Sequence, residues 1–181
     1  MKSKLPFLLL VFAQTLSAQS FTEMTGTPFE GVWASSIAFS DINGDGHQDV
    51  LITGRNASNE GIAKLYTNDG MGNFTEVTGT PFIGVRLSSI AFADVNGDGP
   101  QDVLITGFRT GIGRISRLYI NDGMGTFTEL TGTSFEVVNG GSIAFSDVNG
   151  DGRQVVLITG DGNSFARIAK MYINDEMVSI D

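Results

Sequence analysis

The sequence predicts an all-β protein made of three tandem units, each of which folds as a small four-stranded antiparallel sheet. Three observations lead to this fold class: the sequence repeats itself every 53 residues, each repeat contains four short apolar runs separated by turn residues, and no segment shows sustained helical spacing of apolar residues. The chain also has 24 glycines among 181 residues, a usage that favours strands and tight turns over helices.

The repeat is visible in one nine-residue stretch. Phe21–Phe29 reads FTEMTGTPF, and it recurs as FTEVTGTPF at Phe74–Phe82 and as FTELTGTSF at Phe127–Phe135. The shift is the same at each step, and it keeps the later aspartates and tyrosines in register without any insertion. We therefore treat residues 19–181 as one repeat domain, with units over residues 27–79, 80–132 and 133–181.

Within the first unit, apolar runs predict strands over residues 36–40, 50–54, 63–67 and 74–78. The second run, Val-Leu-Ile-Thr-Gly, is continuous rather than alternating, so we expect it to be buried on both faces. The Asn-Asp-Gly that starts at residue 68 is a turn signal between the third and fourth strands.

Four strands in about 50 residues are typical of a β-propeller blade, because a β-solenoid uses a shorter period and a sandwich does not repeat so faithfully. Three blades are fewer than the four to eight that close a propeller. The chain begins with an outer strand, residues 21–26, that has no blade before it, and it ends on a third strand. One hypothesis is a homodimer in which two chains exchange outer strands and close a six-bladed ring. The alternative is a fragment or decayed copy of a longer propeller.

Each unit carries an Asp-rich loop between its first two strands. Side-chain oxygens fall at loop positions 1, 3, 5 and 9, and a glycine at position 6 permits a sharp turn; the carbonyl at position 7 adds a further oxygen. These residues are Asp41, Asn43, Asp45, His47 and Asp49 in the first loop and Asp94, Asn96, Asp98, Pro100 and Asp102 in the second. A hard cation that prefers six to eight oxygens suits this donor set, and calcium suits it best.

The third loop has Asp147, Asn149, Asp151 and Arg153 at the corresponding positions but ends in Val155. It loses one carboxylate and gains a cation, so we expect weaker binding there and two to three calcium ions in all. Three ions would move the formal net charge from −9 toward −3. The loops differ from an EF-hand because no Glu stands at position 12 and strands flank them. Simple Asp-Gly turns are the alternative.

Composition excludes several function classes. A net charge of −9 argues against a nucleic-acid partner, since binding to phosphates needs a basic face. The absence of cysteine excludes disulfides, zinc–thiolate sites and cysteine nucleophiles. Residues 1–18 have a basic start, an apolar stretch too short to span a membrane and a small residue at the end, which predicts a signal peptide and a secreted, periplasmic or cell-surface protein without membrane insertion.

At the loops the chain resembles the FG-GAP repeat family, also called VCBS repeats, which is found in integrin α-subunit propellers and in bacterial secreted proteins. The resemblance rests on the run AFSDINGDG at residues 38–46 with DVLI at 49–52, and on their two counterparts. It implies a propeller with calcium between the first two strands of each blade, and a role in adhesion or recognition; some members are appended to polysaccharide-acting enzymes.

The sequence shows no catalytic constellation, so we predict a protein that is not an enzyme. Its only histidine, His47, lies inside an Asp-rich loop. The repeats differ mainly at two connections that a propeller would place together, opposite the calcium loops, and this divergence suggests a surface for a protein or glycan ligand. The candidate contacts are Trp33, Arg55, Arg86 and Arg109. The alternative function is a non-catalytic accessory module of a larger extracellular enzyme that acts on polysaccharides.

Overall fold

The structure is a computed structural model that describes residues 19–174. Within this range the chain forms strands, turns and one short 3₁₀ turn at Asn163–Phe165. The strands are β1 (Trp33–Ser40), β2 (Asp49–Arg55), β3 (Gly61–Asn68), β4 (Phe74–Val77), β5 (Arg86–Ala93), β6 (Asp102–Arg109), β7 (Gly113–Asn121), β8 (Phe127–Leu130), β9 (Ile143–Ser146), β10 (Val155–Asp161) and β11 (Arg167–Tyr172).

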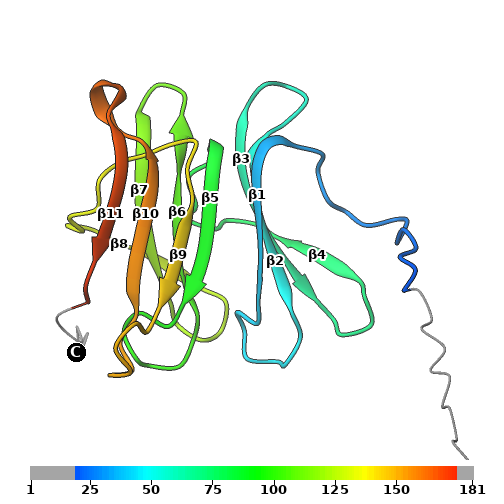
Figure 1. The fold of residues 1–181 in the computed structure, drawn as a ribbon. Coiled ribbons are helices and arrows are strands. Elements are labelled where there is room, and N and C mark those ends of the chain that lie inside the picture. The colour runs from blue at the N-terminus through cyan, green and yellow to red at the C-terminus, as the bar shows by residue number, and fades with distance from the viewer. Residues whose placement is uncertain (1–18, 175–181) are drawn as a thin grey trace, which may run out of the picture.

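These strands form three separate antiparallel sheets, one from each repeat (Figure 1). The first sheet has the order β1-β2-β3-β4 and the second has the order β5-β6-β7-β8, whereas the third contains β9, β10 and β11. The predicted all-β class and the predicted strand order within each repeat are confirmed. No sheet closes on itself within the described residues, so ring closure stays a prediction.

The second strand of each repeat lies inside its sheet, and its apolar run explains why. Val50, Leu51 and Ile52 in β2 are all less than 10% exposed although successive side chains point to opposite faces. β6 shows the same burial, as the continuous apolar run predicts. In β10, however, Leu157 is 39% exposed, whereas its equivalents Leu51 and Leu104 are fully buried. The third sheet therefore has one apolar face that nothing in the described chain covers.

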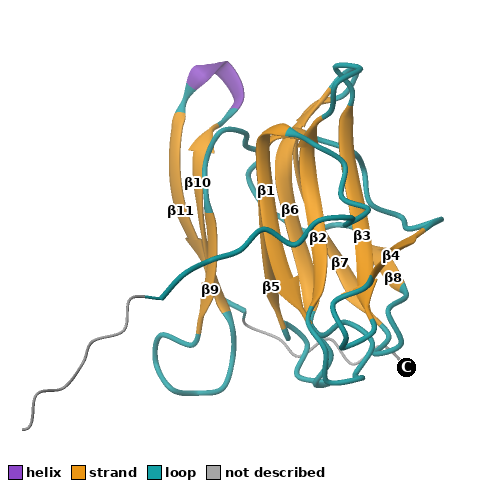
Figure 2. Cartoon of the chain, turned by 90° about the vertical axis from the view of Figure 1, so that its right-hand side faces the viewer, coloured by secondary structure: helices purple, strands orange, loops and turns teal. Residues whose placement is uncertain are grey.

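The sheets stack in chain order, with the second sheet between the other two (Figure 1). In the view of Figure 2 the third sheet stands to one side of the other two. Ile90 and Ile105 of the second sheet pack against Leu51 and Leu65 of the first. On its other side, Leu104 belongs to a second cluster with Val156 and Ile158 of the third sheet. Burial of such side chains contributes roughly 1.5–3 kcal/mol each, so both inter-sheet layers stabilise the stack.

The same hydrogen bonds recur between neighbouring sheets. The backbone N–H of Ile90 donates to Ser36 Oγ at 3.1 Å, and that of Ile143 donates to Ser89 Oγ at 3.1 Å. The repeat is therefore structural as well as sequential, because each sheet meets the next one through the same contacts.

The expected outer strand at residues 21–26 is not a strand in the single chain. The segment runs as an extended coil beside the first sheet, and Phe21 is 96% exposed. Among the described residues, no helix is long and apolar enough to cross a membrane. The predicted signal peptide at residues 1–18 lies outside the described residues.

Candidate functional site

The Asp-rich loops lie between the first and second strands of each sheet, and each loop is organised by its first aspartate. In the first loop, Asp41 accepts backbone N–H bonds from Gly44 and Gly46, both at 2.8 Å. Both glycines have positive φ, a conformation that glycine adopts without steric cost. The loop therefore curls around the Asp41 carboxylate.

The other two loops repeat this geometry. Asp94 accepts from the N–H groups of Gly97 and Gly99 at 2.7 and 2.9 Å. In the third loop, Asp147 accepts from Gly150 and Gly152 at the same two distances. The hydrogen bond from Gly152 is the main cause that lowers the pKa of the Asp147 carboxyl. The substitution at Val155 leaves this part of the loop unchanged.

The structure gives the aspartate at position 9 a connecting role that the sequence did not predict. Asp49 is fully buried, and its two carboxylate oxygens accept the backbone N–H groups of Ile42 at 3.1 Å and Asn68 at 2.8 Å. Asp102 makes the same pair of bonds with Val95 at 3.0 Å and Asn121 at 2.9 Å. Position 9 therefore joins the start of the loop to the end of the third strand.

Burial of these two carboxyls shifts their titration. The pKa of Asp102 is raised to about 6, mainly by desolvation; the two backbone N–H bonds oppose this shift, and the charges of Asp98 and Asp94 add to it. Desolvation also raises the pKa of Asp49, with smaller contributions from Asp45 and Asp41. A bound cation would offset this concentration of negative charge.

The oxygen donors in the first two loops are of the kinds that a hard cation prefers. In the first loop the side chains of Asn43 and Asp45 contact each other at 2.9 Å, and Asp41 lies within hydrogen-bonding distance of the same turn. In the part of the chain that the structure describes, no three His, Cys, Asp or Glu side chains gather as a metal-binding group, and the predicted set also relies on an amide and a carbonyl oxygen. Such neutral oxygens are normal calcium ligands.

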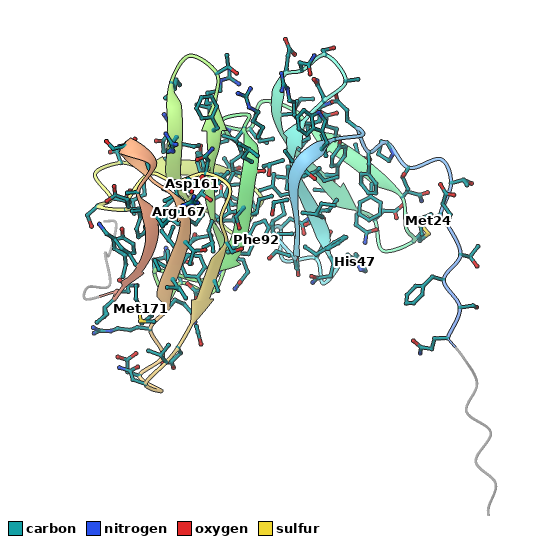
Figure 3. The ribbon with its side chains drawn as sticks, turned by 45° about the horizontal axis from the view of Figure 1, so that its top comes forward. Met24, His47, Phe92, Asp161, Arg167 and Met171 are labelled. Atoms are coloured by element: carbon teal, nitrogen blue, oxygen red, sulfur yellow. The ribbon has the colours of Figure 1, made fainter. Side chains whose placement is uncertain are left out.

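The residue at position 7, whose backbone carbonyl is a predicted ligand, also packs its ring against a neighbouring turn. The His47 ring lies against Gly70, and the Pro100 ring lies against Gly123, so that neither glycine has room for a Cβ. Both glycines belong to the Asn-Asp-Gly turns that end the third strands. The His47 ring is thus occupied by packing against this turn, at the loop end of the first sheet (Figure 3).

At the opposite end of the sheets, the structure brings the predicted contact residues together in pairs. Trp33 and Arg55 are cross-strand neighbours at the open ends of β1 and β2, with the guanidinium carbon 5.2 Å from the centre of the indole ring. Arg86 and Phe108 are the equivalent pair in the second sheet, at 4.7 Å, and Arg86 also donates to Thr110.

A backbone irregularity positions these pairs. The pairing of β1 with β2 shifts in register between Trp33 and Ser36, and Ala34 in this stretch has a positive φ of 49°. The facing strand accommodates this bulge because it has Gly54, where a Cβ would lie 2.6 Å from Ser35 Cβ. The Trp33 side chain at the bulge remains open to solvent, and 56% of its surface is exposed.

One predicted contact residue and the third sheet depart from this pairing. Arg109 donates to the carbonyl of Gly84 at 3.2 Å, so it connects the loop to the inter-sheet segment. In the third sheet the corresponding pair is Asn139 and Asp161, which form an isolated β-bridge and both accept from Arg114. Sequence reasoning missed Phe108 and Asp161. Both occupy the position of Arg55 under the 53-residue shift, so aligning the end of the second strand as well as the start of the first identifies them.

Comparison with known protein families gives a match to part of the repeat domain. Residues 41–105 match the family described as FG-GAP-like repeat, a range that runs from the first Asp-rich loop through the second one. Comparison with the curated protein sequences gives no match.

Among solved structures, the chain is similar to a fucose lectin from Kordia zhangzhouensis, solved in complex with methyl-fucoside. The TM-score is 0.51 at 11% identity, and the similarity covers 78% of this chain and 98% of the lectin. At this identity the likeness concerns the fold alone. Residues 41–105 are thus similar to the FG-GAP-like repeat family, and the internal repeat carries the same pattern, in register, into the third unit.

Proposed function

We propose that this protein is a secreted, non-catalytic recognition module that binds carbohydrate at the end of its sheets opposite the Asp-rich loops. Calcium in the loops at Asp41–Asp49 and Asp94–Asp102 would stiffen the sheets, with weaker binding at the third loop. The ion would supply charge neutralisation, and the side chains of the loops would hold it together with the carbonyls of His47 and Pro100.

The observation that carries this proposal is the exposed Trp33 indole beside the Arg55 guanidinium. An aromatic face packs against the C–H face of a sugar ring, and a guanidinium donates hydrogen bonds to sugar hydroxyls. Arg86 and Phe108 offer the same two chemistries on the neighbouring sheet with the strands exchanged. Two such pairs suit a ligand of more than one sugar unit.

The similarity to a fucose lectin supports the choice of sugar as the first ligand to test, because that protein has a similar fold and was solved in complex with methyl-fucoside. Fucosides are therefore the first probes for this chain. The Asp-rich loops are poor candidates for acid–base chemistry, because their carboxylates already accept backbone N–H bonds. A role as the accessory module of a polysaccharide-acting enzyme uses the same surface, and it predicts a preference for polymer over methyl-fucoside.

Trp33 is the only tryptophan, so its fluorescence reports on this site directly. Titration with methyl-fucoside and with fucosylated oligosaccharides should shift the emission of the calcium-loaded protein. Trp33→Ala and Arg55→Ala should each weaken binding at least tenfold on a glycan array. Met124→Ala is the matched control, since Met124 is 78% exposed on a turn at the other end of the sheets. Unchanged binding by Trp33→Ala would overturn the assignment of the site.

A further inference from the structure

The fourth strand of the first two sheets is held by the same contacts in both. In the first sheet, Glu76 of β4 lies opposite Tyr66 of β3 and accepts a charged hydrogen bond from Lys64 at 3.1 Å. In the second sheet, Glu129 of β8 lies opposite Tyr119 of β7 and pairs with Arg117 at 2.7 Å. An outer strand is therefore recognised by its glutamate and by its register on the third strand.

The first residue of the outer strand completes a group of three aromatic rings. Phe74 packs on Phe29 at 4.9 Å between ring centres, and Phe29 packs on Tyr66 at 5.1 Å. Phe127, Phe82 and Tyr119 repeat this trio in the second sheet, with both distances at 5.0 Å. Aromatic pairs of this kind contribute beyond the area that they bury.

The third sheet has two members of this trio and a groove where the third would lie. Phe135 and Tyr172 pack at 5.1 Å. They line a groove of about 650 Å³, together with Leu118 and Leu130 of the second sheet and Met171 of β11. Within residues 19–174, β11 pairs with β10 alone, so its other edge presents unpaired backbone groups.

The chain contains a third copy of the outer-strand sequence, and the structure leaves it unused. Phe21-Thr22-Glu23-Met24 aligns with β4 and β8 under the 53-residue shift, and it differs from them only at its last, apolar residue. In the single chain Phe21 is 96% exposed and Met24 is 61% exposed. One outer strand and one open strand edge are thus present in the same chain.

The chain cannot join these two parts to each other. An outer strand completes one sheet, and the chain then continues into the first strand of the next sheet. β4, for example, completes the first sheet and leads into β5 of the second. Phe21–Met24 leads into β1, so it belongs on a sheet that would precede the first one. Met24 and Met171 lie at opposite sides of the molecule, with all three sheets between them (Figure 3).

The two outer faces of the stack are also complementary. Ile37 of β1 is 57% exposed, whereas its equivalent Ile90 is 7% exposed because the first sheet covers it. Met171 of β11 is 57% exposed, whereas its equivalents Leu65 and Leu118 are at most 5% exposed because the next sheet covers them. If the third sheet of one copy stacked on the first sheet of another, both faces would be buried in the manner of the two inter-sheet layers already present.

We propose that the segment Phe21–Met24 of one copy adds as the fourth strand to β11 of a second copy, and that the reciprocal exchange closes two chains into a ring of six sheets. Strand addition to an open edge provides the main-chain hydrogen bonds. Glu23 then lies opposite Tyr172 and pairs with Lys170, which already contacts Glu136 at 2.9 Å as Lys64 contacts Glu30 at 3.0 Å. Phe21 enters the groove and completes the aromatic trio.

The 53-residue shift also predicts a hydrogen bond across the new interface. Asn121 Nδ2 donates to the carbonyl of Ile42, and Asn174 Nδ2 donates to that of Val95, each across one inter-sheet boundary. By the same shift, Asn68 of one copy would donate to the carbonyl of Val148 of the other. Val148 is 59% exposed in the single chain, as this position requires if a further sheet is to cover it.

The exchange is tested by disulfide trapping, because the chain has no cysteine of its own. Leu65 lies opposite Val77 and Leu118 opposite Leu130, so Met24 should lie opposite Met171 of the other copy. A mixture of a Met24→Cys copy and a Met171→Cys copy should give a covalent heterodimer on mild oxidation. Replacing the second copy by Met71→Cys, exposed by 82% but elsewhere, should give none. A Met24→Cys/Met171→Cys chain that forms its disulfide internally would overturn the proposal.

Closure of the ring is tested by solution mass. Sedimentation of the calcium-loaded protein should give twice the mass of the chain. Phe21→Ala should shift the dimer toward monomer at least tenfold in dissociation constant, and Phe21→Tyr should retain it. Because Phe21 is almost fully exposed in the single chain, the strands should persist by circular dichroism in both variants. A monomer, or an open-ended series of larger assemblies, for the unaltered protein would overturn the closed ring.

Discussion

The second and third Asp-rich loops begin with the same six residues, Asp-Val-Asn-Gly-Asp-Gly, but they differ at position 9. Their tips have the same hydrogen bonds: Asp94 and Asp147 each accept two glycine N–H groups at 2.7 and 2.9 Å. Asp102, however, accepts one N–H group from Val95 at the start of the loop and one from Asn121 at the end of β7, whereas the Val155 side chain has no oxygen to offer. The loop tip is therefore encoded locally, and position 9 connects it to the sheet.

This difference predicts that Asp102→Val costs more stability than any change at the loop tip. The substitution removes the acceptor of the Val95 and Asn121 N–H groups, and each buried unpaired group costs about 1–3 kcal/mol. We expect a loss of about 2–4 kcal/mol in urea unfolding measured with a chelator present. Asp98→Asn, at the exposed tip of the same loop, is the control and should change stability by less than about 0.5 kcal/mol. Equal losses in the two variants would contradict a connecting role for position 9.

The reverse change tests whether position 9 also limits calcium binding. Isothermal titration should show two sites in the unaltered protein and a weaker third. Val155→Asp should strengthen the third site by about tenfold, equal to about 1.4 kcal/mol, because it restores a carboxylate near Asp147 and Asp151. Chelation should lower the unfolding temperature of both proteins. No gain in affinity or stoichiometry in Val155→Asp would show that the ion does not depend on position 9.

The smallest expected effect is a pH dependence confined to the metal-free protein. The folded pKa of Asp102, about 6, lies above its usual value, so folding is penalised above pH 6 and the penalty is relieved as the pH falls toward 4. The urea midpoint of unfolding, measured with a chelator present, should therefore rise as the pH is lowered from 7 to 5. Asp102→Asn should remove most of this rise, with Asp49 accounting for the remainder. A midpoint that falls over this range in the unaltered protein would contradict the assignment.

Much of the fold could be predicted from the sequence because the repeat reports the same local pattern three times. The turn at Asn68, the buried run at Val50 and the Asp-rich loops all lie where their residue types require. The buried role of Asp49 could not be predicted in this way, because it depends on how the loop folds back onto the Asn68 N–H at the end of the third strand. The pairing of Arg86 with Phe108 likewise depends on the bulge, which brings strand ends into contact that sequence spacing leaves apart.

The identical faces between successive sheets have a consequence for how such a gene changes. Since successive sheets meet through equivalent apolar positions and recurring hydrogen bonds, duplication or deletion of a whole 53-residue unit would largely preserve the packing between sheets. A change in copy number would then be limited by the terminal segments, which must meet for a ring to close, rather than by the contacts between repeats. Within a single chain only the middle sheet has a neighbour on both sides, whereas in a closed ring every sheet would have two.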